Sequence, residues 1–230
     1  MKTSYYISPG FTNIKFLTFN LDNPKNGDWN QAVEVFKNRF NSRFFIPITH
    51  LIKGSEIVMS EGDEKDVFHP GFITLSIDCT LLETLNQFKH GINDSTVCFH
   101  NSCSFSLILM GTPKLSQYFP TKEDAGHFYN DVRCGLVHQG QTKGNSKLNK
   151  NQNFIVNHYK NGGLGFDVNR TMFHEFVVEE YDKYMSCLLD VNNKVYDNMR
   201  ENFRDKMHFL CGQNLPQKKE KKCRFCGNKI

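Results

Sequence analysis

The chain has 230 residues, 39% hydrophobic and 23% charged, a balance that excludes an extensively disordered protein and, with 21 phenylalanines, can fill a large core. The net charge of +4 comes from residues 216–230, where six basic residues and one glutamate give +5, so the composition does not imply a broad basic face on the rest of the chain. No stretch approaches the about 20 apolar residues that cross a bilayer, and the first residues lack a signal-peptide apolar run, so we expect a cytoplasmic protein with no membrane partner.

The first 27 residues combine aromatics with turn formers, and we expect an irregular segment that packs on the core and includes a short strand at residues 16–20. Apolar residues then recur at three- and four-residue spacing from Ala32 to Phe44. This spacing predicts a helix that begins after an Asp28 cap. Pro47 is expected to bend or end that helix.

Residues 72–90 alternate at first like a strand, but 19 residues without a breaker favour a buried helix that closes at Gly91. Glu83 lies inside this apolar stretch, and because a buried carboxylate needs partners, we expect it to pair with an arginine, with a catalytic role as the alternative. The next helix is expected to begin at a Thr121 cap, with two carboxylates in its first turn, and to end at Gly140.

Two apolar stretches, residues 154–157 and 164–168, flank the turn formers at residues 161–163, a pattern typical of a β-hairpin. Apolar stripes at residues 173–188 and 195–210 predict two long helices after it. The expected fold is therefore mainly α: a bundle of four or five helices with a small β-hairpin insertion and a short cysteine-containing C-terminal tail.

No linker rich in Pro, Gly or Ser divides the chain. We therefore expect one helical domain at residues 28–212, preceded by the segment 1–27 and followed by a basic tail at residues 213–230. Most cysteines are scattered through apolar or helical stretches, which favours reduced thiols over a disulfide framework. These are Cys79, Cys98, Cys103, Cys134 and Cys187.

One segment has catalytic character: Arg133-Cys134-Gly135-Leu136-Val137-His138, near the end of the helix that begins at Thr121. An arginine, then four to six residues, then a histidine is the signature of the HEPN superfamily. These helical nucleotide-binding domains include many metal-independent ribonucleases. Arg43 and His50, with six residues between them, form a second instance of the pattern, but Pro47 interrupts it.

Residues 28 to 210 resemble an uncharacterised bacterial subgroup of this superfamily. Its members combine a helix similar to Leu81-Leu82-Glu83-Thr84-Leu85 with a segment similar to Arg-Cys-Gly-Leu-x-His-Gln. The resemblance implies an endoribonuclease of a bacterial defence or toxin system. It also implies a homodimer in which two Arg/His pairs meet in one cleft, and a partner protein within the same defence system.

Cys134 departs from the family pattern, because a polar residue follows the arginine in many active members and a thiol is a weak hydrogen-bond partner. The alternative function is therefore a catalytically inactive HEPN-like scaffold that binds nucleic acid or a partner protein. A third interpretation makes Cys134 a nucleophile with His138 as its base. It is disfavoured, because nucleophilic cysteines usually lie at helix N-termini and this one is near a C-terminus.

RNA cleavage through the 2′-hydroxyl needs the chemistry that these residues offer. His138 exchanges protons near neutral pH, and Arg133 presents a permanent planar cation to the phosphorane oxygens, so no cofactor is expected for catalysis. Their five-residue offset places them about 140° apart on an ideal helix. The alternative is a structural pair at a helix end.

Asn130, Cys134 and His138 follow one another at four-residue spacing and share one row of an ideal helix. This row predicts that Asn130 and Cys134 orient His138 or a bound phosphate. For Asn130 the alternative is an ordinary exposed polar residue.

The C-terminal tail contains two ligand pairs, each with two residues between its members and eleven residues between the pairs. This spacing fits a structural zinc site with three thiolates and one imidazole, and metal-free thiols are the alternative. The predicted ligands are His208, Cys211, Cys223 and Cys226. Basic residues around the second pair are predicted to contact RNA phosphates, with a solvated tail as the alternative. They are Lys218, Lys219, Lys221, Lys222 and Arg224.

Overall fold

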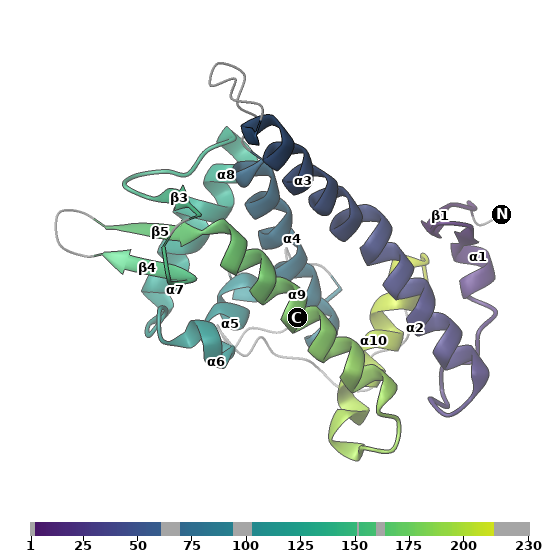
Figure 1. The fold of residues 1–230 in the computed structure, drawn as a ribbon. Helices are drawn as coiled ribbons and strands as arrows, with labels where there is room; N and C mark the ends of the chain where they lie inside the picture. Colours follow the sequence, from purple (N-terminus) through teal and green to yellow (C-terminus); the bar gives the residue numbers. More distant parts are fainter. Residues whose placement is uncertain (1–2, 61–69, 94–102, 151, 160–163, 214–230) are drawn as a thin grey trace. The chain divides into compact units, whose positions relative to one another are not determined.

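The computed structural model describes residues 3–60, 70–93, 103–150, 152–159 and 164–213. Within these ranges the chain is mainly helical, as expected, and its strands form two small sheets (Figure 1). The helices are α1 (Asn13–Phe16), α2 (Gly27–Phe40), α3 (Ile46–Ser60), α4 (Gly71–His90), α5 (Cys103–Gly111), α6 (Pro113–Ser116), α7 (Lys122–Phe128), α8 (Cys134–Gln139), α9 (Arg170–Leu189) and α10 (Asp197–Leu210). Two π-helical turns, η1 (Asn41–Phe45) and η4 (Tyr129–Arg133), and one 3₁₀ turn, η5 (Lys194–Tyr196), join them. The strands are β1 (Tyr6–Ser8), β2 (Phe11–Thr12), β3 (Lys147–Asn149), β4 (Val156–Tyr159) and β5 (Gly165–Asn169).

The chain divides into two compact units, each built from separate segments of the sequence. Unit 1 comprises residues 1–50, 87–94 and 181–220, and unit 2 comprises residues 51–86, 95–180 and 221–230. The domain limits expected at residues 27 and 212 stay a prediction. In the part of the chain that the structure describes, no helix combines the length and apolar character needed to span a membrane.

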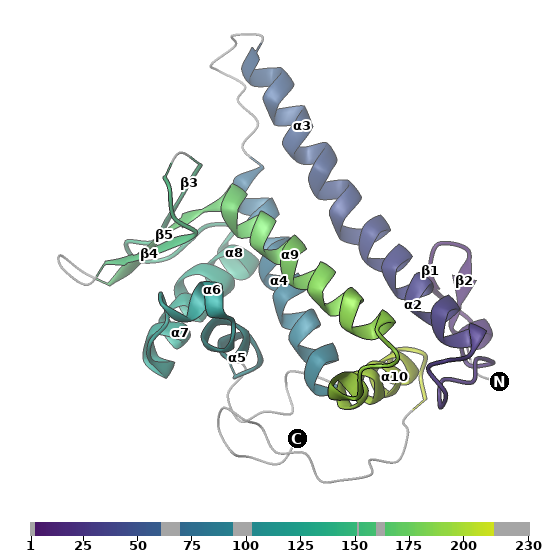
Figure 2. The same ribbon diagram turned by 60° about the horizontal axis from the view of Figure 1, so that its bottom comes forward.

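The N-terminal segment of unit 1 forms the antiparallel hairpin β1–β2, followed at once by α1 (Figure 2). The Thr12 hydroxyl accepts a hydrogen bond from the Lys15 N–H at 3.3 Å and caps α1. Phe16 is therefore the last residue of a helix, and the strand expected at residues 16–20 is wrong. A local cap outweighed the aromatic, strand-like composition there.

The N-cap of α2 lies two residues earlier than the sequence indicated. The Asn26 side chain accepts a hydrogen bond from the Trp29 N–H at 3.0 Å, so Asn26, and not Asp28, is the N-cap. Asp28 lies inside the first turn and accepts a hydrogen bond from the Asn20 N–H at 2.8 Å. An N-cap bonds an N–H two or three residues further on, and only Asn26 has that geometry here.

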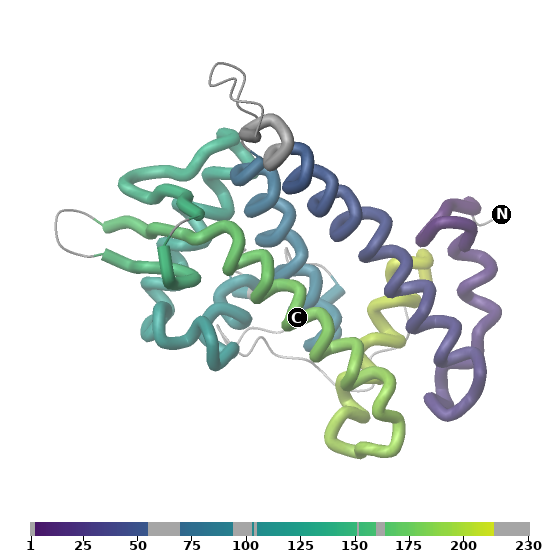
Figure 3. Tube along the Cα trace, viewed as in Figure 1, coloured from purple at the N-terminus to yellow at the C-terminus, as the bar shows by residue number. Residues whose placement is uncertain are grey.

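The helical backbone continues from α2 through η1 into α3, and Figure 3 traces it as one uninterrupted coil. Pro47 is the second residue of α3, so the helix does not end there, and the alternative expectation, a bend at Pro47, stays a prediction. Proline has no N–H with which to continue the hydrogen-bond ladder, and the π-turn η1, in which the Ile46 N–H bonds to the Asn41 carbonyl, directly precedes α3.

The core of unit 1 is a cluster of aromatic rings around Phe36. Its ring centroid lies 4.7 Å from that of Phe88 and 5.4 Å from that of Phe203. Trp29, the only tryptophan, is 1% exposed, and its indole N–H donates to the Leu188 carbonyl at 3.0 Å. Helices α2, α4 and α10 thus contribute side chains to this aromatic core, and α9 adds Tyr184, whose ring centroid lies 6.0 Å from that of Phe36.

Three helix ends follow the sequence prediction. The Thr121 hydroxyl accepts a hydrogen bond from the Asp124 N–H at 3.1 Å and caps α7. Gly91 and Gly140 follow α4 and α8 with φ values of +62° and +70°. These left-handed conformations suit glycine and end each helix where expected.

The small sheet of unit 2 contains the predicted hairpin, β4 paired antiparallel with β5, and an unpredicted third strand, β3, paired parallel with β5. The buried β5 leads directly into α9. The Asn169 side chain caps that helix by accepting hydrogen bonds from the Thr171 and Met172 N–H groups, both at 3.1 Å. Phe128 of α7 packs on this sheet, with its ring centroid 5.1 Å from that of Phe166.

Candidate functional site

Arg133 is the last residue of η4, and Glu83 of α4 holds its guanidinium. Nη2 of Arg133 donates to Oε2 of Glu83 at 3.0 Å, and the two side chains are 20% and 8% exposed. The guanidinium carbon lies 5.4 Å from the centroid of the Tyr129 ring. The prediction that Glu83 pairs with an arginine is confirmed. The pair fixes the guanidinium, because breaking it would leave a buried carboxylate without a counter-charge.

Burial and the Arg133–Glu83 pair shift the pKa values of ionisable groups around the motif. Burial lowers the pKa of Arg133, but the charge and hydrogen bond of Glu83 outweigh it, and the pKa is raised overall. Burial raises the pKa of Tyr129 to about 12, against the opposing charge of Arg133. Burial also raises the pKa of the Cys79 thiol well above its usual range. At neutral pH Tyr129 and Cys79 are therefore neutral, and Arg133 remains a cation.

His138 lies in the last turn of α8 and is exposed to solvent. Among the described residues none forms a hydrogen bond or ion pair with its imidazole, and Arg133 is not joined to it directly. Residues 134–139 form a regular α-helix, so the offset of about 140° between the two positions is not removed by the backbone. The structure thus presents one fixed guanidinium and one solvated imidazole on the same helical stretch.

The predicted orienting residues lie on either side of a change in helical geometry. In η4 the Cys134 N–H bonds to the Tyr129 carbonyl, five residues back, which makes the turn wider than an α-turn. The four-residue spacing therefore aligns Cys134 with His138 in α8, but not Asn130 with Cys134. Asn130 is exposed, and its side chain forms no hydrogen bond with a described residue.

Gly135, inside the motif, has a structural role that sequence reasoning did not identify. A Cβ atom at this position would lie 2.6 Å from the Gln141 carbonyl oxygen and 3.2 Å from the Lys143 backbone nitrogen. The Lys143 N–H in turn donates to the Asp131 carbonyl at 2.8 Å. Gly135 therefore allows the chain after α8 to fold back against the motif helix. The signal in the sequence was a glycine in a helix interior, which usually has a packing reason.

Half of the predicted zinc site lies in the described residues. His208 is buried at the end of α10, with its Nδ1 3.2 Å from Oε1 of Gln213, and burial raises the pKa of the Cys211 thiol to about 12. Cys223 and Cys226 lie outside the described residues, as do the basic residues Lys218, Lys219, Lys221, Lys222 and Arg224. In the described ranges no three His, Cys, Asp or Glu side chains are grouped to hold a metal ion. The zinc site stays a prediction.

Free thiols are found at the cysteines predicted to be reduced, except Cys98, which is outside the described residues. They are Cys79, Cys103, Cys134 and Cys187, together with Cys211. Cys134 follows a π-turn within a continuous helix, so it has no open helix N-terminus beside it to favour a thiolate. This position gives the nucleophile interpretation no support.

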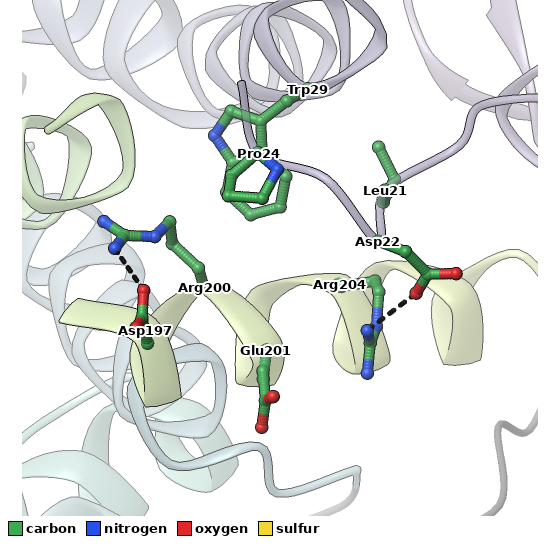
Figure 4. A pocket seen from close by; sticks show the side chains of 8 residues that line it. All are labelled: Leu21, Asp22, Pro24, Trp29, Asp197, Arg200, Glu201 and Arg204. Atoms are coloured by element: carbon green, nitrogen blue, oxygen red, sulfur yellow. Dashed lines mark hydrogen bonds and ion pairs between the residues drawn. The ribbon is translucent and has the colours of Figure 1, made fainter. Parts of the chain in front are cut away.

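Unit 1 contains a pocket of about 540 Å³ between the start of α2 and α10 (Figure 4). Its two arginines are already engaged: Arg200 donates to Oδ1 of Asp197 at 2.6 Å, and Arg204 donates to Oδ1 of Asp22 at 2.9 Å. Trp29 forms part of the opposite wall. None of the predicted functional residues lines this pocket, so it is not the site of the predicted chemistry.

The residues of unit 2 that carry the predicted chemistry are thus Arg133, fixed by Glu83, and His138, exposed one and a half turns later. A permanent planar cation and an imidazole are suited to acid-base chemistry on an anionic substrate. No family model, curated protein or solved structure matches this chain.

Proposed function

We propose that the chain is a HEPN-like, metal-independent endoribonuclease, with His138 as acid and base and Arg133 as the phosphate-stabilising group. The observation that carries this proposal is the Arg133–Glu83 pair. It fixes a guanidinium that is still 20% exposed, on the same helical stretch as an exposed histidine.

The reaction uses only groups of the RNA and of this chain. A histidine removes the proton of the 2′-hydroxyl, whose oxygen attacks the adjacent phosphorus. The bond to the 5′-oxygen breaks, and that oxygen takes a proton, which leaves a 2′,3′-cyclic phosphate and a 5′-hydroxyl. Nη2 of Arg133 donates to Glu83, and in this proposal Nη1 donates to the phosphorane oxygens as negative charge develops.

Two copies of the chain are part of this proposal. Because Arg133 and His138 start about 140° apart on the helix, one copy does not place both groups on one face. A homodimer in which two Arg/His pairs meet in one cleft would supply one histidine as base and another as acid. The resemblance to HEPN proteins supports this arrangement and a role in bacterial defence or as a toxin.

The test compares two exposed histidines. We expect His138→Ala to lower the rate of RNA cleavage about 10²- to 10⁴-fold, the usual contribution of a general acid or base. The matched control is His50→Ala. It removes the exposed histidine of the second pattern, Arg43 with His50, and should leave the rate unchanged. Cleavage is measured with a labelled RNA in the presence of EDTA, and the product ends are identified by mass spectrometry.

Cleavage by His138→Ala at the rate of the unaltered chain would refute the proposal. Tight RNA binding with intact RNA after long incubation would favour the alternative, a HEPN-like scaffold that binds nucleic acid or a partner protein without catalysis. The half-buried Cys134, in place of a polar residue after the arginine, is the observation on which that alternative depends.

A further inference from the structure

Two arginines of unit 1 lie against the N-terminal strand. Nη1 of Arg39, in α2, donates to the Ile7 carbonyl at 2.8 Å, and Nη2 of Arg43, in η1, donates to the Tyr6 carbonyl at 3.1 Å. Figures 1 and 2 both show β1 beside this end of α2. Because the acceptors are consecutive carbonyls and the arginines are four residues apart on one helical stretch, the two guanidinium groups lie close together.

These two cations have no carboxylate partner in the part of the chain that the structure describes. Burial and the positive charge of Arg43 lower the pKa of Arg39 to about 10, and the groups that act in the opposite direction are Cys211 and Tyr5. A half-buried cation next to a like charge is costly, and a bound anion would relieve that cost.

Exposed aromatic rings accompany the arginines. Tyr6 is 68% exposed and Tyr5 is 42% exposed, although most tyrosines bury part of their ring. Tyr5 is held in place, because its hydroxyl donates to the Leu210 carbonyl at 2.7 Å and its N–H donates to Oδ1 of Asn13 at 2.9 Å. Uncompensated arginines beside exposed aromatic rings are what sites for single-stranded nucleic acid use: the cations contact phosphates and the rings stack on bases.

We propose that Tyr5, Tyr6, Arg39 and Arg43, the Tyr–Arg surface, form a binding site for single-stranded nucleic acid on unit 1. The arginines contact a phosphate, and Tyr6 stacks on an adjacent base. This surface belongs to a different unit from Arg133 and His138 and does not depend on cleavage. If the proposed function holds as well, the surface supplies part of the affinity for the RNA that is cleaved.

The test uses a fluorescent 2′-O-methyl oligouridylate and the full chain, with binding measured by anisotropy. The methyl group removes the attacking hydroxyl, so the probe stays intact whether or not the chain cleaves RNA. We expect Tyr6→Ala to weaken binding about 5- to 100-fold, the range for loss of one base stack. We expect Arg43→Gln to weaken binding and to reduce the slope of log K against log salt by about 0.7, as for one lost phosphate contact.

The matched control is Lys37→Gln. Lys37 lies on the same helix, but its ammonium is 4.0 Å from Oε2 of Glu34 and is already compensated. We expect this variant to bind like the unaltered chain, and circular dichroism verifies that all three variants are folded. The proposal would be overturned if Tyr6→Ala and Arg43→Gln bound the probe as tightly as the unaltered chain. It would also be overturned if Lys37→Gln lost as much affinity as those two variants. Binding to phosphatidylserine vesicles in place of the oligonucleotide would overturn it too.

The two proposals can fail separately. Loss of probe binding in Arg43→Gln, together with undiminished cleavage in His138→Ala, would support the Tyr–Arg surface and refute the proposed catalytic residues. Normal probe binding in Arg43→Gln, with cleavage abolished in His138→Ala, would give the opposite result.

Discussion

The two π-helical turns, η1 in unit 1 and η4 in unit 2, each contain an arginine that is followed by a histidine after four to six residues. The two arginines differ in their charged partners. In η4, Arg133 is half-buried and paired with Glu83 at 3.0 Å. In η1, Arg43 is exposed and donates to a backbone carbonyl, with no carboxylate partner in the described residues. The same sequence pattern therefore gives a guanidinium that is held by a carboxylate in η4 and one without a described carboxylate partner in η1.

The difference depends on a residue far from the pattern. Glu83 precedes Arg133 by 50 positions and reaches it from another helix, whereas no carboxylate among the described residues forms an ion pair with Arg43 of η1. Pi-turns are frequent at functional sites, so the geometry of the turn does not by itself distinguish the two arginines. The counter-charge does: Glu83 holds the Arg133 guanidinium in one position, as preorganised stabilisation of developing charge requires, whereas no described carboxylate competes with an anion for Arg43.

The largest expected effect is on stability. Arg133→Met leaves the buried carboxylate of Glu83 unpaired, and we expect it to lower the free energy of unfolding by about 3 kcal/mol. Arg43→Met should change it by less than about 0.5 kcal/mol, because Arg43 is exposed. Urea unfolding measures both. Recovery of stability in the double variant Arg133→Met/Glu83→Leu is required, and a failure to recover would contradict this account of the pair.

A second comparison concerns cleavage. Arg133→Lys keeps the positive charge next to Glu83 but loses the planar fork of donors, and we expect a rate about 10²- to 10³-fold lower, as for loss of one preorganised donor. Arg43→Lys should leave the cleavage rate unchanged at saturating RNA. Single-turnover kinetics on a short labelled RNA separate the two variants. Equal losses in both would mean that η4 has no special part in the reaction.

Gly135→Ala perturbs the motif helix without removing a functional group. The added Cβ would meet the Gln141 carbonyl oxygen at 2.6 Å, so the segment after α8 has to shift. We expect a loss of about 1–3 kcal/mol in unfolding free energy, typical of overpacking. Thermal unfolding provides the measurement, and Gly126→Ala on α7, where a Cβ would meet nothing within 4 Å, is the control. Equal stability losses in the two variants would exclude a specific role for Gly135.

The smallest expected effect is a dependence on pH. Nδ1 of His174 lies 2.8 Å from Oδ1 of the buried Asp78. Burial lowers the pKa of His174, but the hydrogen bond and charge of Asp78 outweigh it, so the pKa is raised overall. The resulting stabilisation is fully present below the unfolded value of about 6.5 and is lost as pH rises through the higher folded value. Urea unfolding from pH 6 upwards should show this decline, and the double variant Asp78→Asn/His174→Gln should lack it.

Features with local causes could be predicted from the sequence. The Thr121 cap, the left-handed Gly91 and Gly140 and the hairpin that ends in β5 each depend on residues a few positions apart. The α2 cap was misplaced by two residues because Asn26 and Asp28 are both good cap residues, and the sequence does not show which side chain meets the free N–H.

Features with distant causes could not be predicted. Strand β3 exists because it pairs with β5, about 20 residues later, and short polar strands have no periodicity of their own. The need of Glu83 for an arginine followed from burial, but which arginine it meets is decided by the packing of α4 on η4. The π-turns could not be predicted either, because apolar residues four apart, such as Phe40 and Phe44, fit an α-helix as well as they fit a π-turn.

The single tryptophan of the chain makes unit 1 distinguishable from unit 2 by fluorescence. Trp29 is buried in unit 1, against Phe203 and the Leu188 carbonyl, and unit 2 has none. Its emission therefore monitors the melting of unit 1 alone, while the helical signal in circular dichroism averages over the whole chain. Noncoincident transitions by the two probes would reveal that the units lose their structure one after the other.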